Sequence, residues 1–240
     1  MPGLLQVVGV PIGNLADMPP RALQALQSAD AIVCEDTRRT GQLLQLMALG
    51  KKPLISNHQN NEYRQVETLL ARLQVGAQLV LVSDSGMPAI SDPGALLVAA
   101  ARAAGVRVDV IPGPCAAVLA VAGSGFAGGF VLAGFPPRKG RVRQEWLARL
   151  GASPETVVAY ESPFRVADLA ADMLAAWGNR PAWLARELTK MHEEWLGPNL
   201  QELVATLQKR SGVKGECVLV VQGVLPAPKA EKPHRTAAKW

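Results

Sequence analysis

Four short, nearly continuous apolar runs alternate with helical patterns through the first half of this 240-residue chain. The runs cover residues 4–10, 31–34, 79–82 and 108–111, and the helical patterns cover residues 21–28, 62–73 and 95–104. Such alternation predicts a parallel α/β sheet. Because helices cover both faces of a parallel sheet, its strands carry few polar residues, as these do. We therefore expect a ligand in the turns that follow the strands.

The second half of the chain begins at a sharp break, the sequence Pro112-Gly113-Pro114. Strand-like runs follow at residues 130–132, 156–160, 182–186 and 217–222, and helical patterns at residues 115–122, 141–150, 165–177 and 200–209. Turns are spread evenly among these strands, which favours a mixed sheet. We expect an N-terminal α/β domain over residues 1–113 and a C-terminal α/β domain over residues 114–225. Residues 226–240 form a basic tail that we expect to be disordered, because it has too few large apolar residues to fold.

The composition argues against several classes of protein. No stretch approaches the roughly 20 consecutive apolar residues of a membrane-spanning helix, and the N-terminus lacks the features of a secretory signal. Cys34, Cys115 and Cys217 share no zinc-site spacing with the three histidines. We therefore expect no disulfide and no metal, buried apolar roles for the cysteines, and a cytoplasmic location. The net charge of +5 permits a polyanionic partner without requiring one.

A glycine motif at residues 123–128, Gly-Ser-Gly-Phe-Ala-Gly, resembles a dinucleotide-binding fingerprint but lies in the wrong context. The fingerprint must follow a strand and open a helix, whereas this segment follows a helical pattern and precedes a strand. We interpret it as a flexible joint between the two domains. The chain also lacks the motifs of P-loop enzymes, serine hydrolases and zinc proteases.

Charged residues crowd the end of the strand at residues 31–34. Glu35, Asp36, Arg38 and Arg39 lie within five positions, where guanidinium groups suit phosphate and carboxylates suit a hydroxyl group. The alternative is a helix N-cap at Asp36 with solvated arginines, which leaves Glu35 unexplained.

Two further turns of the first half have features of a binding site. Residues 8–15 contain two glycines that let the backbone approach a ligand closely, although a simple tight turn explains this segment better when it is taken alone. Residues 82–94 form a turn of unusual length, which is typical of loops that bind something. In it, Asp84 is suited to a polar group of a ligand, and Asp92 to starting a turn with Pro93.

Polar motifs of the second half lie at strand ends or just before strands. They are Tyr160-Glu161-Ser162-Pro163-Phe164-Arg165, Arg186-Glu187-Leu188-Thr189-Lys190 and Lys214-Gly215-Glu216. Each suits a structural ion pair as well as it suits a site. The basic residues at positions 138–143 form either a solvated face or a surface that follows a phosphate backbone.

Eight motifs occur in one order along the chain. They read G-x-P-I-G-N-L, E-D-T-R-R-T-G, S-D-S-G-M-P-x-I-S-D-P-G, I-P-G-P, G-F-x-P, Y-E-S-P-x-R, R-E-L-T-K and K-G-E. Together they resemble the family of ribosomal RNA small subunit methyltransferase I, within the tetrapyrrole-methylase superfamily. The resemblance implies two α/β domains of the tetrapyrrole-methylase fold (class III S-adenosylmethionine methyltransferases), with S-adenosylmethionine in the interdomain cleft. It also implies a homodimer that methylates the 2′-hydroxyl of a cytidine in 16S ribosomal RNA of the small subunit.

Site residues follow from the resemblance and from residue type. The resemblance implies cofactor contacts at nine positions: Pro11, Ile12, Asp84, Met87, Cys115, Ala116, Tyr160, Glu187 and Lys214. Residue type and turn position suggest Glu35, Asp36 and Lys190 for orienting or deprotonating the ribose. The residues suited to RNA phosphates are Arg38, Arg39, Arg138, Lys139, Arg141 and Arg143. The chain departs from the family pattern at Val10 and Met87, which lack a usual hydroxyl, and at Phe164, where the absence of the common His argues against a histidine base.

Methyl transfer from a sulfonium requires in-line positioning of the acceptor oxygen, and a carboxylate or a Lys of lowered pKa suits removal of its proton. Two alternatives stay open. A methylase of a small tetrapyrrole would bind a corrinoid precursor, since the same fold supports that chemistry. A non-catalytic RNA-binding module would bind RNA regardless of S-adenosylmethionine.

Overall fold

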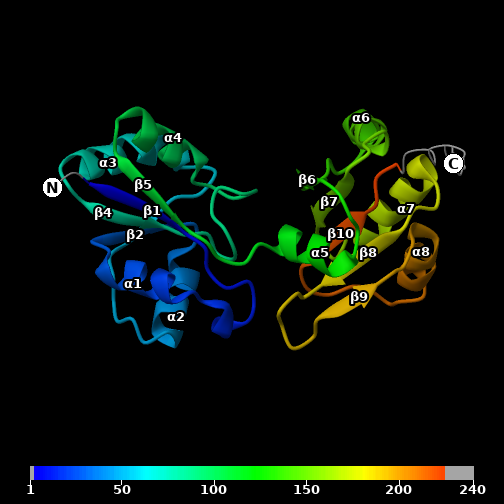
Figure 1. Ribbon diagram of the computed structural model, residues 1–240, viewed down its shortest axis with the longest axis horizontal. Helices are drawn as coiled ribbons and strands as arrows, with labels where there is room; N and C mark the ends of the chain where they lie inside the picture. Colours follow the sequence, from blue (N-terminus) through cyan, green and yellow to red (C-terminus); the bar gives the residue numbers. More distant parts are fainter. Residues whose placement is uncertain (1–2, 225–240) are drawn as a thin grey trace, which may run out of the picture.

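The computed structural model describes residues 3–224 and contains two five-stranded sheets, each formed by a different half of the chain (Figure 1). The first sheet contains β1 (Leu4–Val8), β2 (Ala31–Cys34), β3 (Leu54–Ser56), β4 (Gln78–Leu81) and β5 (Arg107–Ile111). Its strand order is β3-β2-β4-β1-β5, and every pair in it is parallel. The predicted parallel α/β sheet is therefore confirmed.

Helices cover both faces of the first sheet. They are α1 (Pro20–Ser28), α2 (Thr37–Leu46), α3 (Glu62–Gln74) and α4 (Ala95–Ala103), and a 3-10 turn, η1 (Leu15–Asp17), precedes α1. Ile32 and Cys34 pack with α1 and α2, whereas Ala31 and Val33 pack with α3 and α4. Since alternate side chains of β2 enter different cores, the whole strand is apolar.

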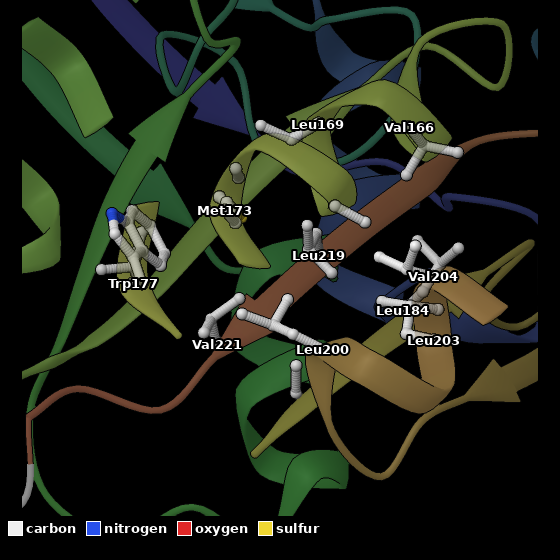
Figure 2. Packing of buried hydrophobic residues seen from close by; sticks show 14 of the residues in the cluster. Val166, Leu169, Met173, Trp177, Leu184, Leu200, Leu203, Val204, Leu219 and Val221 are labelled. Carbon is white, nitrogen blue, oxygen red and sulfur yellow. The ribbon is translucent and has the colours of Figure 1, made fainter. Parts of the chain in front are cut away.

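The second sheet is mixed, as predicted. It contains β6 (Phe130–Gly134), β7 (Thr156–Glu161), β8 (Ala182–Arg186), β9 (Glu194–Leu196) and β10 (Cys217–Val221), in the order β6-β7-β10-β8-β9. Only the β6–β7 pair is parallel. The helices α6 (Gly140–Gly151), α7 (Val166–Trp177) and α8 (Leu200–Gln208) cover one face, where Figure 2 shows side chains of α7 and α8 gathered around β8 and β10.

The opposite face of the second sheet is covered by α5 (Ala116–Ser124). Ala117 and Ala120 of α5 pack against Val158 and Val220 of the sheet, and Ile12 from the loop after β1 joins the same hydrophobic cluster. The two halves therefore share a hydrophobic core at the point where they meet.

The glycine motif at residues 123–128 lies inside the second half, so its interpretation as a joint between domains is wrong. It runs from the end of α5 to the start of β6, and α5 packs against β7, β8 and β10. Gly123 is pressed against the ring of Trp195. The chain passes from one sheet to the other earlier, at residues 112–115, and a domain division between residues 113 and 114 stays our prediction. The predicted tail at residues 226–240 lies outside the described residues.

Three loop backbones meet where β1, β4 and β5 end. A Cβ atom added to Gly9 would lie 2.6 Å from Cα of Gly113 and 2.6 Å from Sδ of Met87. The Gly9 N–H donates to the carbonyl of Ile111 at 3.1 Å, and Val10 and Gly86 exchange two backbone hydrogen bonds of 2.9 and 3.1 Å. Only glycine allows backbones to approach so closely.

We expect the Gly113→Ala substitution to lower the free energy of unfolding by about 1–3 kcal/mol, because the added methyl group would overlap the Gly9 backbone. Urea denaturation of the purified chain measures this. Gly41→Ala is the control, since Gly41 lies in α2 with no neighbour closer than 3.8 Å to an added Cβ. That change should stabilise the helix by up to about 1 kcal/mol. Equal stabilities for the two variants would contradict the role of the glycine contact.

Candidate functional site

The loops at the carboxyl ends of the parallel strands surround a cavity between the two sheets. This central cavity has a volume of about 290 Å³. Its first-half wall includes Ile12, Met87 and Ile90, and its second-half wall includes Phe135 and Tyr160. The position agrees with the expected ligand site of a parallel α/β sheet, outside the carboxyl ends of its strands.

Two polar side chains of β7 face this largely apolar cavity. The Tyr160 hydroxyl accepts a hydrogen bond from the Ala117 N–H at 3.3 Å, and burial raises its pKa. Glu161 is 3% exposed, and its Oε1 accepts from Ser162 N–H and from the Arg165 guanidinium. Its Oε2 is buried and has no hydrogen-bond partner among residues 3–224. A buried acceptor of this kind needs a donor, so the cavity suits a ligand with an amino or hydroxyl group.

A second, more polar cavity of about 230 Å³ adjoins the first. Ile12, Ser85 and Glu216 line both cavities, and Arg39 and Asp84 line only the second. We call it the polar cavity. Its arginine and carboxylate are suited to a phosphate and a hydroxyl group.

Three carboxylates lie near one another: Asp84 lines the polar cavity, Asp92 lines the central cavity, and Glu35 lines neither. Asp84 Oδ1 accepts from the Asp36 N–H at 3.0 Å, and Oδ2 lies 3.6 Å from Nε of Arg39. Burial, and then the charge of Asp84, raises the pKa of Glu35. Burial, together with the charges of Glu35 and Asp84, raises the pKa of Asp92 to about 6. Asp92 therefore changes its protonation state close to neutral pH, as suits a group that accepts a proton.

Asp36 is the N-cap of α2, which is the alternative role that the sequence offered for it. Its carboxylate caps α2 by accepting from the Arg38 N–H at 2.9 Å and forms an ion pair with the Arg38 guanidinium at 2.6 Å. The hydrogen bonds from Arg38 lower the pKa of Asp36 far below its ordinary value. Since these hydrogen bonds favour its charged form, Asp36 is less suited than Glu35 to accepting a proton, and its role in orienting the ribose stays a prediction. Arg38 is exposed and lines neither cavity.

Lys190 is also unsuited to accepting a proton. Its Nζ lies 2.9 Å from Oε1 of Glu187 and 3.2 Å from Oε2 of Glu216. Burial opposes the charged form, but these carboxylates outweigh it and raise the pKa of Lys190 above its ordinary value. A Lys that removes a proton needs a lowered pKa, which Lys190 does not have, and Lys190 instead holds Glu216 at the edge of both cavities.

The nine predicted cofactor positions divide into three groups. The residues in the central cavity are Ile12, Met87, Cys115, Ala116 and Tyr160. Pro11 and Asp84 line the polar cavity. Glu187 and Lys214 line neither: the Glu187 carboxylate accepts from the Glu216 N–H at 2.9 Å, and the carbonyl of Lys214 accepts from Arg186 at 2.8 Å. Both contacts hold the loop of residues 214–216 in place without facing a cavity.

The three cysteines differ in burial. Cys34 and Cys217 are buried as predicted, whereas Cys115 is half-buried and faces the central cavity.

Of the four basic residues predicted for RNA at positions 138–143, three line a separate groove on the second half: Arg138, Lys139 and Arg143. Arg141 points elsewhere, since it is exposed, pairs with Glu145 at 2.7 Å and does not line that groove.

Three site residues were missed by sequence reasoning: Asp92, Glu161 and Phe135. Asp92 had a plausible role in a turn, and Glu161 had a plausible ion pair, which indeed exists with Arg165 at 2.6 Å. A sequence signal was present in each case, because all three residues belong to recognised motifs.

Among residues 3–224 no helix is long and apolar enough to cross a bilayer, and no group of three or more acidic, His or Cys side chains is arranged to bind a metal ion.

The chain is similar in sequence to one family of known proteins. The family model described as Tetrapyrrole (Corrin/Porphyrin) Methylases matches residues 5–204. The protein named Ribosomal RNA small subunit methyltransferase I from Escherichia coli O157:H7 is 45% identical over 92% of this chain and 78% of its own length. The protein of the same name from Thermotoga maritima is 41% identical over 92% of this chain and 99% of its own length.

The fold has similar relatives among solved structures. Uroporphyrin-III C-methyl transferase from Thermus thermophilus, solved in complex with S-adenyl homocysteine, has a TM-score of 0.63 and 18% sequence identity. The match covers 92% of this chain and 97% of that one. At this identity the likeness describes the fold.

We expect Asp92→Asn to stabilise the protein at pH 7.5 and to have little effect at pH 4. The carboxyl pKa rises from 3.8 to about 6 in the folded state, so the folded protein retains a proton that the unfolded chain has lost. Stability is therefore lost as the pH rises from about 4 through about 6. The gain in the variant at pH 7.5 is expected to be roughly 1–3 kcal/mol by urea denaturation. A gain of the same size at both pH values would show that ionisation of Asp92 costs no stability.

Proposed function

The chain belongs to the tetrapyrrole methylase family, and on that basis we propose that it methylates ribosomal RNA of the small subunit with S-adenosylmethionine as methyl donor. The observation that carries the proposal is identity of 41–45% over 92% of the chain with relatives named for that activity. The proposal includes a cytidine 2′-hydroxyl of 16S ribosomal RNA as acceptor and a homodimer, which rest on the family resemblance, and a cytoplasmic location, which rests on the pattern of cysteines.

The central cavity supports S-adenosylmethionine as the cofactor. Ile12, Met87 and Ala116 offer apolar surface, while Glu161 Oε2 is a buried acceptor that an amino or hydroxyl donor would satisfy. Gly86 has a φ of +78° and faces Ile12 and Pro114, so backbone forms the cavity wall there. S-adenosylmethionine carries amino and hydroxyl donors, and when bound it supplies an electrophilic methyl group.

The polar cavity supports a nucleotide as the acceptor. Arg39 is placed for a phosphate group, and Asp84 for a ribose hydroxyl. Asp84 is itself held by the Asp36 N–H, so its orientation is fixed before substrate arrives. Preorganisation of this kind favours the in-line approach that methyl transfer requires.

We propose that Glu35 and Asp92 share the removal of the ribose proton. Their raised pKa values make them better proton acceptors than an ordinary carboxylate, and Asp92 faces the central cavity. Asp36 and Lys190 are left out, because neither accepts a proton readily. A carboxylate in this role typically contributes a factor of about 10²–10⁴ to the rate.

The direct experiment is nucleoside mass spectrometry on unmethylated small ribosomal subunits incubated with the purified chain and S-adenosylmethionine. Appearance of 2′-O-methylcytidine supports the proposal. Its absence, with cofactor binding intact in calorimetry, would favour methylation of a small tetrapyrrole instead. RNA binding without any cofactor binding would favour the non-catalytic module.

We expect Glu35→Gln to lower turnover at least tenfold while leaving the affinity for S-adenosylhomocysteine unchanged, because Glu35 does not line the central cavity. Release of S-adenosylhomocysteine measures the turnover. Glu67→Gln is the matched control, since Glu67 is an exposed carboxylate on α3. Full activity in Glu35→Gln would transfer the whole proton-accepting role to Asp92.

A further inference from the structure

A groove between α6 and α7 lies outside the two cavities and has a volume of about 690 Å³. Four cationic side chains line it: Arg138, Lys139, Arg143 and Arg165. Two carboxylates, Asp168 and Asp172, also line it, so cations are in excess. We call it the α6–α7 groove. An excess of cations in a concave surface favours an anionic ligand.

Arg143 is a buried arginine with one guanidinium nitrogen that has no hydrogen-bond partner in the described part of the chain. It is 4% exposed, its Nη2 lies 2.8 Å from Oδ2 of Asp172, and its Nη1 donates to the carbonyl of Pro137 at 3.0 Å. Its Nε is buried and has no partner within residues 3–224. Since buried polar groups are almost always hydrogen-bonded, an acceptor in the groove would complete this guanidinium.

The first turn of α6 adds free backbone donors to the same groove. Lys139 is the N-cap residue of this 12-residue helix, and its side chain makes no capping hydrogen bond. Gly140 follows with a φ of +76° and also lines the groove. The uncapped N–H groups and the positive end of the helix dipole favour a phosphate.

Two exposed phenylalanines lie near these sites: Phe135 lines the central cavity, and Phe164 lies between that cavity and the α6–α7 groove along the chain. Phe164 is 90% exposed, and its neighbours in sequence line the two sites: Pro163 the cavity and Arg165 the groove. Phe135 is 61% exposed and lies 5.6 Å from Tyr160, between ring centroids. Arg143 holds the loop after Phe135 through the Pro137 carbonyl. Exposed rings beside cations are typical of single-stranded nucleic-acid binding, in which bases stack on the rings.

We propose that the α6–α7 groove and Phe164 bind the single-stranded RNA beside the target nucleotide. The groove takes a phosphodiester through Arg138, Lys139, the Arg143 Nε and the first turn of α6. Phe164 stacks on a neighbouring base and directs the strand toward the central cavity. This inference rests on the proposed function. It implies that the RNA reaches the central cavity from the side of α6 and α7.

Fluorescence anisotropy with a labelled single-stranded RNA tests the proposal at several salt concentrations. The double variant Arg138→Ala with Lys139→Ala should bind at least tenfold more weakly. Its plot of log affinity against log salt should lose about 1.4 from its slope, at about 0.7 for each phosphate contact removed. Phe164→Ala should bind about 5- to 100-fold more weakly with an unchanged salt slope, because stacking is not ionic.

Matched controls separate local contacts from general charge. Arg102→Ala with Arg149→Ala removes the same net charge from exposed positions on α4 and α6 that do not line the groove. Tyr63→Ala removes an 80% exposed ring from α3. Both controls should change RNA affinity less than twofold. All variants should keep wild-type affinity for S-adenosylhomocysteine, which shows that they are folded.

Two outcomes overturn the inference in distinguishable ways. If the wild-type chain methylates small subunits but the groove and Phe164 variants bind RNA as their controls do, this surface is not the RNA path and the proposed function stands. If the wild-type chain neither methylates small subunits nor binds RNA, the proposed function and this inference fail together.

Discussion

The site depends on the close backbone contact among the loops that follow β1, β4 and β5. Gly9 lies against Gly113, and Val10 pairs with Gly86, so three segments distant in sequence are joined at one point. From that point the β1 loop carries Ile12 into the hydrophobic core of the second half. Both cavities lie around this junction, and a side chain at either glycine would separate the segments that form them.

Ionic groups near the junction are arranged so that some are held in place and others stay available. Asp36 and Lys190 are committed to ion pairs and keep their charges. Glu35 and Asp92 are half-buried and lie near other negative charge, so their carboxylates bind protons more readily. The ion pair between buried Glu161 and half-buried Arg165 connects the central cavity to the α6–α7 groove through the turn that bears Phe164. The residues that we propose for cofactor binding, proton transfer and RNA binding thus adjoin one another.

Much of the fold could be predicted because its strands are buried on both faces and its helices are amphipathic. The prediction missed α2, β3 and β9. The sequence of α2 begins with four polar residues and contains Gly41, a residue that disfavours helices, while β3 and β9 have only three residues each. The glycine motif at residues 123–128 was misplaced because glycine marks a tight contact, here with Trp195, as readily as it marks a joint.

The sequence by itself determined the alternating elements, the break at residues 112–114, the order of the motifs and the set of polar residues available at the strand ends. These are local properties, since periodicity and turn chemistry act over a few residues. Only the tertiary structure decided which residues of each motif face a cavity and which form ion pairs. It distinguished Glu35 from Asp36, two half-buried neighbours of the same chemical type: partial burial and the charge of Asp84 raise the pKa of Glu35, whereas Asp36 caps α2 and binds Arg38. Burial and neighbouring charge depend on segments far away in the chain, so no local pattern encodes them.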